Sequence, residues 1–348
     1  MNKGIGEKFQ SLVSSLVGPV NILITQVDPD ALASAFTLAY LIRLVRKENM
    51  VRVFYGGAIS HAQNRTICNR LGLLDRMIPA AKMTEDDFKN LALVDSSMTM
   101  DGRCFKDRKL EPVIVIDHHR GGDVVQTGYN FVWIDEVGAC ATLLTELCVF
   151  LKVNLTEADQ TIALLLALGI YTDTNSLISA SERDFLAYNQ TVSGIRNSSD
   201  LHAMFNYPLQ AEHYENMKRA LDQCRHEGAY LVASLGSIHA TGGDDLSTIA
   251  DYLIRREGVS LVVVWALIKE EKIVRISARC TDSSLDLCSF LRDRFGSSCG
   301  SKFTADGKAV GGGNMVLNFG FWFTPNTTPE VLALVKKFVD SAIFNKAV

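Results

Sequence analysis

The first half of the chain alternates short apolar runs with longer segments of helical period. The runs are rich in Val, Ile and Leu, end in acidic or turn residues, and cover 20–25, 51–55, 91–94 and 113–116. The segment after Asp30, ALASAFTLAYLIRLVRKEN, has a helical period and ends in basic residues, as a helix C-terminus favours. This alternation predicts an α/β fold with a mainly parallel sheet and helices on both faces.

The second half repeats the alternation after a polar break. Residues from about 191 to 209 lack a clear period, and 210–225 has the pattern of a connecting helix. Beyond it, the apolar segments AYLVASL, VSLVVVWALI and IVRISARC alternate with helical patterns, followed by a glycine loop, the strand MVLNFGFWF and a last helix. We therefore predict a first domain over 1–195, a linker and connecting helix over 196–225, and a smaller α/β domain over 226–348 that faces the first across a cleft.

Composition indicates an ordered globular protein. Of the 348 residues, 47% are hydrophobic and 21% charged, which provides enough apolar surface for a core. The formal net charge of −4 argues against a protein that coats long nucleic acid, whereas a short phosphorylated substrate needs only local positive charge. The eight cysteines form no C-x-x-C pair, so we expect neither a zinc site nor a disulfide framework, and a cytoplasmic location.

The apolar N-terminal stretch LVSSLVGPVNILIT is interrupted by Ser, Gly, Pro and Asn. This pattern predicts a helix end, a turn and a strand in place of a signal peptide. No run approaches the roughly 20 apolar residues of a membrane span. We expect no membrane association.

Carboxylates and imidazoles follow several of the apolar segments. They are Asp28 and Asp30 in VDPDALAS, Asp95 in LALVDSS, Asp117, His118 and His119 in VIVIDHH, and Asp173 in YTDTNS. A single strand-terminal Asp is more often a helix cap or turn former. Together, hard oxygen ligands and one imidazole suit Mn²⁺ or Mg²⁺, and two such ions roughly 3.5–4 Å apart are a usual device for phosphoryl displacement.

The ordered set of D-x-D, a strand-terminal Asp, D-H-H and a later Asp resembles the DHH superfamily of phosphoesterases. The second half resembles the DHHA1 domain of that superfamily through RISARC and the basic glycine segment GKAVGGGN. In length and layout the chain is similar to bacterial nanoRNase and phosphoadenosine-phosphate phosphatase enzymes. Those enzymes trim very short oligonucleotides or remove a phosphate from phosphorylated nucleotides.

This resemblance implies a role for each residue of the set. Asp28 and Asp95 would hold one ion, and Asp30, Asp95, His118 and Asp173 the other, with Asp95 as the bridge. Asp117 would orient the imidazole or complete the site, and His119 would face the scissile phosphate. A polar turn after a strand is the alternative explanation for the two histidines.

In the second domain, Arg275, Ser277 and Arg279 alternate along one strand and so point to one face. The resemblance makes them ligands for the terminal phosphate or base of the substrate; a solvated strand face is the alternative. The run Gly311, Gly312 and Gly313 can offer backbone N–H groups to an anion, or form a plain tight turn. Asn314 follows this run, where the family commonly has a histidine.

A second departure concerns the segment before Asp28. Family members usually have a histidine there that completes the first metal site, whereas residues 24–27 of this chain include none. Gln26 occupies the place where RecJ-type relatives have an aspartate, and a neutral amide is a weaker metal ligand than either group. We predict a metal-dependent phosphoesterase acting on short oligonucleotides or phosphorylated nucleotides, as a homodimer by the resemblance. A pyrophosphate or polyphosphate hydrolase and a catalytically inactive nucleotide-binding regulator are the alternatives.

Overall fold

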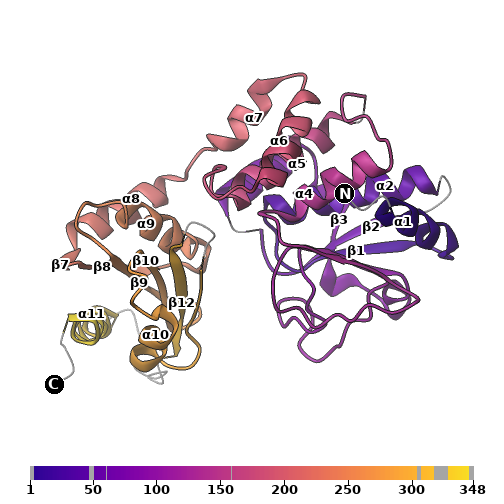
Figure 1. The fold of residues 1–348 in the computed structure, drawn as a ribbon. Coiled ribbons are helices and arrows are strands. Elements are labelled where there is room, and N and C mark those ends of the chain that lie inside the picture. Colours follow the sequence, from indigo (N-terminus) through magenta and orange to yellow (C-terminus); the bar gives the residue numbers. More distant parts are fainter. Residues whose placement is uncertain are drawn as a thin grey trace. The chain divides into compact units, whose positions relative to one another are not determined.

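The chain packs as two separate units, Met1–Pro208 and Leu209–Val348 (Figure 1). The computed structural model describes residues 4–46, 51–59, 61–157, 159–303, 307–316 and 328–344. The division falls inside the predicted connecting segment, with α7 (Ser198–Phe205) in the first unit and α8 (Ala211–Asp222) in the second.

A six-stranded parallel sheet of order β3-β2-β1-β4-β5-β6 forms the first unit. Its strands are β1 (Val20–Ile24), β2 (Val51–Tyr55), β3 (Met77–Pro79), β4 (Leu91–Val94), β5 (Ile114–Asp117) and β6 (Phe131–Ile134). Strand β2 pairs with β1, β3 pairs with β2, and β4 then pairs with the opposite side of β1. The strand order therefore reverses between β1 and β4, and the carboxyl ends of strands at such a reversal are where α/β proteins bind ligands.

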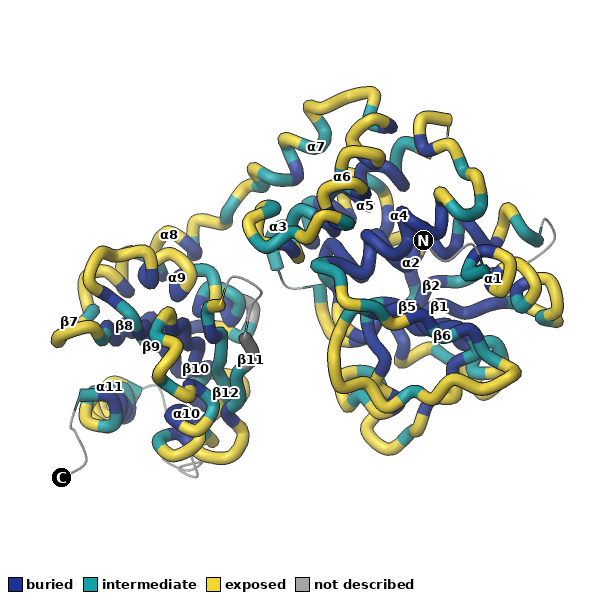
Figure 2. The backbone as a smooth tube through the Cα atoms, in the orientation of Figure 1, coloured by how far each residue is buried: buried dark blue, intermediate teal, exposed yellow. Residues whose placement is uncertain are grey.

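The longer helices of the first unit cover one face of this sheet. They are α1 (Gly4–Ser15), α2 (Pro29–Val45), α3 (Ala62–Arg70), α4 (Cys140–Phe150), α5 (Gln160–Asp173) and α6 (Glu182–Ser193). Ile22 and Ile24 face these helices, whereas Leu23 faces the opposite side, as strand alternation requires. Helix α2 is buried along most of its length, and α5 packs against it (Figure 2).

The opposite face of the sheet carries a smaller apolar cluster. Leu23, Phe54 and Val115 meet side chains from the 3₁₀ turns η2 (Ala80–Lys82) and η3 (Glu85–Phe88) and from the segment after β4. The fold class is therefore the predicted one, with short 3₁₀ turns and loop segments as the cover on this side.

A mixed six-stranded sheet of order β11-β12-β10-β9-β8-β7 forms the second unit. The strands are β7 (Arg225–Glu227), β8 (Tyr230–Ile238), β9 (Leu261–Ile268), β10 (Ile273–Cys280), β11 (Gly300–Phe303) and β12 (Ala309–Val316). Helices α8 and α9 (Asp245–Leu253) pack on one face, and α10 (Leu287–Phe295) and α11 (Thr328–Phe344) on the other. Only β8 and β9 pair in parallel, through the α9 crossover.

The predicted glycine loop is a strand. Gly311, Gly312 and Gly313 lie in β12, which pairs antiparallel with β10 on one side and with β11 on the other. A Cβ on Gly312 would lie 2.3 Å from Ile276 O of β10, so this central position excludes a side chain. Glycine therefore permits the close approach of backbones in a sheet, which the pattern alone does not separate from a turn. Most of the predicted strand MVLNFGFWF lies outside the described residues.

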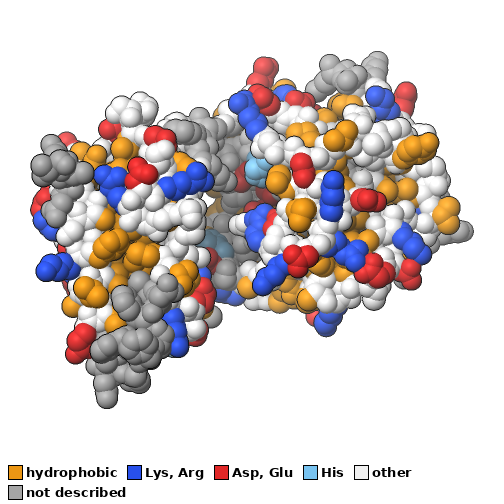
Figure 3. Space-filling view, turned by 90° about the horizontal axis from the view of Figure 1, so that it is seen from below, with side chains coloured by type: hydrophobic (Ala, Val, Ile, Leu, Met, Phe, Trp, Pro, Cys, Tyr) orange, Lys and Arg blue, Asp and Glu red, His pale blue; other side chains and the backbone are white. Residues whose placement is uncertain are grey.

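Acidic and basic side chains intermix on the face shown in Figure 3. The described residues contain no helix with both the length and the apolar character needed to cross a bilayer.

The close packing of β12 predicts that Gly312→Ala destabilises the second unit. The added methyl would meet backbone atoms that cannot move independently, which we expect to lower the free energy of unfolding by about 1–3 kcal/mol. Gly300→Ala is the matched control, because a Cβ on Gly300 of β11 meets nothing within 4 Å. Urea denaturation followed by circular dichroism measures the difference; equal effects of the two substitutions would contradict this account.

Candidate metal centre

Asp28 and Asp30 lie at the junction of β1 and α2. Asp28 caps the helix: its backbone is extended, and its Oδ1 accepts a hydrogen bond of 2.9 Å from Ala31 N. Proline in the first helical turn suits this helix start. Asp30 lies in the same turn with only 1% of its surface exposed. The D-P-D sequence thus places one carboxylate at the cap and the other inside the unit.

The buried Asp30 carboxylate caps a different helix, α4. Its Oδ2 accepts a hydrogen bond from Cys140 N and its Oδ1 one from Ala141 N, both of 2.7 Å. The N-cap residue of α4 is Ala139, which has no side-chain acceptor. The first amides of a helix lack intrahelical partners and lie at the positive end of its dipole, so they stabilise an ionised Asp30.

Asp95 follows β4 in the left-handed region, with φ 55°. Aspartate is one of the few residue types that tolerate this conformation, because its short side chain can bond locally. The Asp95 amide donates to Ile116 O of β5 at 3.0 Å, and the side chain is 8% exposed. The turn directs this carboxylate to the carboxyl ends of β4 and β5.

Asp117 ends β5 and organises the two histidines. Its Oδ1 accepts hydrogen bonds from His118 N (2.8 Å), His119 N (3.1 Å) and His119 Nδ1 (2.8 Å). Its Oδ2 accepts one from Ser97 Oγ at 2.6 Å. Burial opposes the ionised form, but these hydrogen bonds outweigh it and lower the pKa of Asp117. Because an ionised carboxylate only accepts, the Nδ1 of His119 carries a proton.

The His118 imidazole is fixed with Nε2 toward three carboxylates. Its Nδ1 lies 3.2 Å from Val137 O, and a carbonyl only accepts, so Nδ1 is protonated. Its Nε2 lies 3.2 Å from Asp173 Oδ2, 3.3 Å from Asp95 Oδ1 and 3.7 Å from Asp30 Oδ2. In the neutral ring Nε2 therefore holds the lone pair, which is the form that binds a metal.

Asp173 is the last residue of α5, and its side chain is 41% exposed. The segment after it, Asn175, Ser176 and Leu177, has positive φ at each residue. Three consecutive left-handed residues stop the helix, because an α-helix cannot continue through them. Asp173 is thus held at the helix end, on the exposed side of His118.

The described residues contain two groups of possible metal ligands, and within each group the ligand atoms lie within 4.8 Å of one another. One group consists of Asp95, Asp117, His118 and His119, and the other of Asp30, His118 and Asp173. Asp28 belongs to neither group, although its charge acts on Asp30. The structure thus brings Asp30, Asp95, His118 and Asp173 together and places Asp28 beside them.

Crowding and burial raise the pKa of these carboxyls. Burial acts first on Asp30, and the charges of Asp173 and Asp28 add to it, raising its pKa to about 8. Burial and the charge of Asp173 raise the pKa of Asp28 to about 6. Burial and the charges of Asp30 and Asp28 raise the pKa of Asp95 well above its usual value. Burial opposes a charged His118, yet the adjoining carboxylates of Asp173 and Asp95 raise its pKa to about 12.

The chemistry of this centre fits a divalent cation. Asp95 Oδ1 and His118 Nε2 are buried and lie 3.3 Å apart, and neither makes a hydrogen bond of ordinary geometry with a described residue. A buried polar atom without a partner costs free energy, and the repulsion between carboxylates adds to that cost. A cation bound by carboxylate oxygens and one imidazole would offset both effects, and this donor set suits Mn²⁺ or Mg²⁺.

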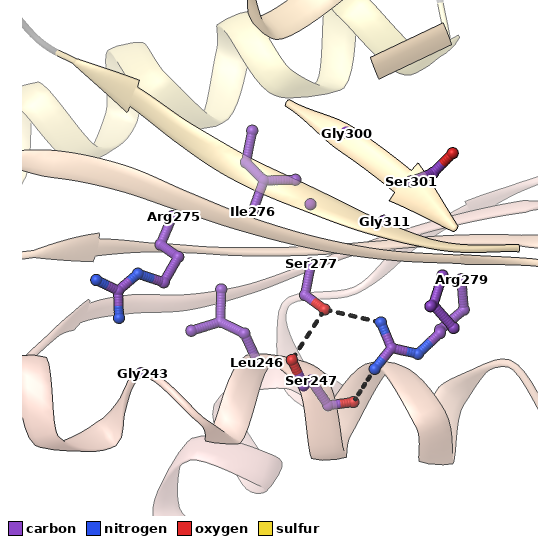
Figure 4. A pocket seen from close by; sticks show the side chains of 12 residues that line it. Gly243, Leu246, Ser247, Arg275, Ile276, Ser277, Arg279, Gly300, Ser301 and Gly311 are labelled. Atoms are coloured by element: carbon purple, nitrogen blue, oxygen red, sulfur yellow. Dashed lines mark hydrogen bonds between the residues drawn. The ribbon is translucent and has the colours of Figure 1, made fainter. Parts of the chain in front are cut away.

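A cavity of about 550 Å³ lies within the second unit (Figure 4). Its lining includes the predicted ligands Arg275, Ser277, Arg279, Gly311 and Gly312, and also Gly243 and Ser247, which sequence reasoning missed. The predicted Gly313 and Asn314 do not line it. Asn314 is exposed, and its Oδ1 accepts a hydrogen bond of 3.4 Å from Arg275 Nε.

The two arginines of β10 differ in how far their charge is neutralised. Arg279 is 7% exposed; its Nε and Nη2 donate to both oxygens of Asp251, and its Nη1 donates to Ser277 Oγ at 3.1 Å. The side chain of Arg275 is 29% exposed, against 9% for that of Arg279, and its Nη2 donates to both oxygens of Glu271, at 3.0 and 3.1 Å. Arg275 is therefore the cation that an entering anion can more easily recruit.

Residues 21–170 match the N-terminal domain of the DHH family. This segment is a DHH-family domain. The matched residues of this DHH domain contain every predicted metal ligand except Asp173, which lies just beyond them. They also contain Ser97, Val137 and the amides of Cys140 and Ala141, which hold the ligands in place.

Relatives of this chain include two uncharacterised proteins of Methanocaldococcus jannaschii. One is 30% identical over 274 residues, which cover 77% of this chain and 53% of the relative, so the chain spans about half the length of that protein. The other is 22% identical over 254 residues, or 73% of each chain. An exopolyphosphatase-related protein of Bacteroides fragilis has a TM-score of 0.69 at 12% identity, covering 98% of this chain and 97% of its own; that likeness concerns the fold.

The crowded carboxyls predict that the metal-free protein loses stability as the pH rises. The folded pKa values of Asp28 and Asp30, about 6 and about 8, exceed the unfolded value of 3.8. Between about pH 4 and pH 8 the folded chain therefore binds more protons than the unfolded chain, and its free energy of unfolding falls with rising pH.

Thermal unfolding in the presence of a chelator measures this effect. We expect a smaller decrease in Tm over the same pH interval for Asp173→Asn, because the substitution removes the charge that adds to burial in raising the pKa of both Asp28 and Asp30. A decrease as large as that of the wild-type protein would show that this cluster is not its cause.

Proposed function

We propose that this chain is a metal-dependent hydrolase of phosphoester bonds in short oligonucleotides or phosphorylated nucleotides. One observation carries the proposal: three carboxylates, two of them buried, converge on the Nε2 of His118, whose other ring nitrogen is fixed by Val137 O. An ordinary structural histidine has no need of several acids at one nitrogen. The match of residues 21–170 to the DHH family supports phosphoester chemistry at such a centre.

The proposed ligands divide into two sets that share Asp95. Asp28 and Asp95 would hold one ion, and Asp30, Asp95, His118 and Asp173 the other. Bound Mn²⁺ or Mg²⁺ would lower the pKa of a coordinated water and offset charge on phosphoryl oxygens. The protein's part is orientation: the α4 amides fix Asp30, and the Val137 carbonyl fixes the tautomer of His118.

His119 is the proposed contact to the phosphoryl group. Its Nδ1–H donates to the ionised Asp117, which fixes the ring, and its side chain is 46% exposed. The remaining ring nitrogen, Nε2, is then the atom through which the imidazole would meet the substrate. Asp117 acts as a positioning residue through this hydrogen bond.

The cavity of the second unit is the proposed site for the rest of the substrate. It combines a partly exposed cation at Arg275, hydroxyls at Ser277 and Ser247, and a glycine-lined backbone. A phosphate or a base edge requires donors of these kinds. Short nucleotides fit this combination better than pyrophosphate, which offers no base or sugar for a second cavity to bind.

The substitution Asp95→Asn tests the proposed chemistry. We expect a loss of at least about 100-fold in kcat together with weaker Mn²⁺ binding, because the shared ligand loses its charge. Asp75→Asn, at an exposed position of the same unit, is the matched control and should leave both quantities unchanged.

The assay follows phosphate and mononucleotide release from di- to pentaribonucleotides, phosphoadenosine-phosphate, pyrophosphate and polyphosphate, each with Mn²⁺ and with Mg²⁺. Release only from pyrophosphate or polyphosphate would replace the proposed substrate class. Nucleotide binding without release from any substrate would identify a catalytically inactive regulator. Full activity of Asp95→Asn would show that the centre is not the catalytic one.

The substitution Arg275→Gln tests whether the cavity of the second unit binds the substrate. A residue that binds a remote part of the substrate contributes to ground state and transition state alike, so we expect KM to rise about tenfold with kcat unchanged. Arg256→Gln, at an exposed position of the same unit, is the control. Steady-state kinetics on the best short substrate measures the split, and a fall in kcat at constant KM would place Arg275 in the chemical step.

A further inference from the structure

Arg103 is held beside the metal centre by two side chains. Its Nε donates to both oxygens of Asp101, at 2.9 and 3.0 Å, and its Nη2 donates to Asp101 Oδ2. Its Nη1 donates to Oε1 of Gln26, which lies two positions before Asp28. Gln26, in the segment where family members usually have a histidine, thus holds a guanidinium.

Backbone packing fixes the segment that carries Arg103. Asp101 is 8% exposed and accepts from Arg103 N at 2.9 Å, and the next residue, Cys104, contacts Thr25 O at the end of β1. A Cβ on Gly56, just after β2, would lie 2.2 Å from Cys104 Sγ. Glycine at this position lets the segment dock against the ends of β1 and β2. The Arg103 position is therefore built into the fold.

The guanidinium keeps donors for a further acceptor. An arginine has five N–H groups, and the hydrogen bonds to Asp101 and Gln26 use one on each nitrogen. Each terminal nitrogen retains one N–H for which the described residues provide no hydrogen-bond acceptor, and the side chain is 51% exposed. Neighbouring N–H groups of this kind match the spacing of phosphate oxygens.

We propose that Arg103 binds a phosphoryl oxygen of the substrate, oriented for this task by Asp101 and Gln26. The inference rests on the proposed function and adds a substrate-binding residue to the same centre. The fixed positive charge has opposite effects on two ligands: it attracts the phosphoryl group and repels a cation at Asp28.

The substitution Arg103→Met tests both effects at once. We expect the affinity of the Mn²⁺-loaded protein for inorganic phosphate to fall at least about tenfold, because a charge-assisted hydrogen-bond donor is lost. The affinity of the phosphate-free protein for Mn²⁺ should rise several-fold, because the repelling charge is lost. Isothermal titration calorimetry measures both constants without any turnover.

Two further variants make the result specific. Arg108→Met removes the same charge from the same segment, at a residue that pairs with Glu85 and stacks on Phe88, and should change neither constant. Arg103→Lys keeps the charge but not the planar fork, so it should retain the wild-type Mn²⁺ affinity and recover only part of the phosphate affinity.

Equal phosphate affinities of the Arg103→Met and Arg108→Met variants would overturn the proposal. A wild-type protein that binds no phosphate would also overturn it. Weaker Mn²⁺ binding by Arg103→Met would also overturn it, because Arg103 would then serve only to order the ligands. A wild-type protein that binds phosphate through Arg103 but hydrolyses no member of the substrate panel would refute the proposed function alone.

Discussion

Repulsion between buried carboxylates is the constraint on which the organisation of the first unit depends. Each acid placed out of water loses hydration, and each neighbour of like charge adds to the cost. The fold compensates some of them locally: Asp30 receives the amides of α4, and Asp117 receives Ser97 and both histidines. Asp95 Oδ1 receives no such donor among the described residues. The described part of the fold thus leaves a buried carboxylate oxygen without a hydrogen-bond donor. A structural hydrogen-bond network would satisfy this oxygen, whereas a cation site leaves it for the ion.

Strand order explains how separate parts of the chain reach this centre. β1 and β4 are adjacent although β2 and β3 intervene in sequence, and β5 lies next to β4. The carboxyl ends of the three strands therefore meet at one edge, where β1 leads to Asp28, β4 to Asp95, and β5 ends at Asp117. Packing of α5 on α2 then sets the end of α5 beside the same edge. The close approach of these helices needs Gly169, where a Cβ would lie 3.0 Å from Ala33 Cβ.

Sequence reasoning located the charged members of the centre because strand-terminal acids stand out from apolar runs. It did not locate their supports. Val137 acts through its carbonyl, and Cys140 and Ala141 through their amides, so their side chains give no signal. The Gly311–Gly313 run was assigned to a loop because glycine favours turns, whereas here it relieves contact between paired strands. Arg103 was missed because an arginine in a polar segment is usually solvated, and only the docking of its segment shows its position.

Charge balance accounts for a fixed cation next to a metal centre. Two divalent ions would balance the carboxylates of Asp28, Asp30, Asp95 and Asp173, and Asp117 is paired with His119. A phosphoryl group entering such a balanced centre would meet no net positive charge. Arg103 adds positive charge to this balance, because Asp101 neutralises the half-exposed guanidinium only in part. The hydrogen bond to Gln26 fixes the direction of the N–H groups of Arg103 that remain unused. An acidic protein can thus attract an acidic substrate through one oriented charge, without the basic surface that long nucleic acid requires.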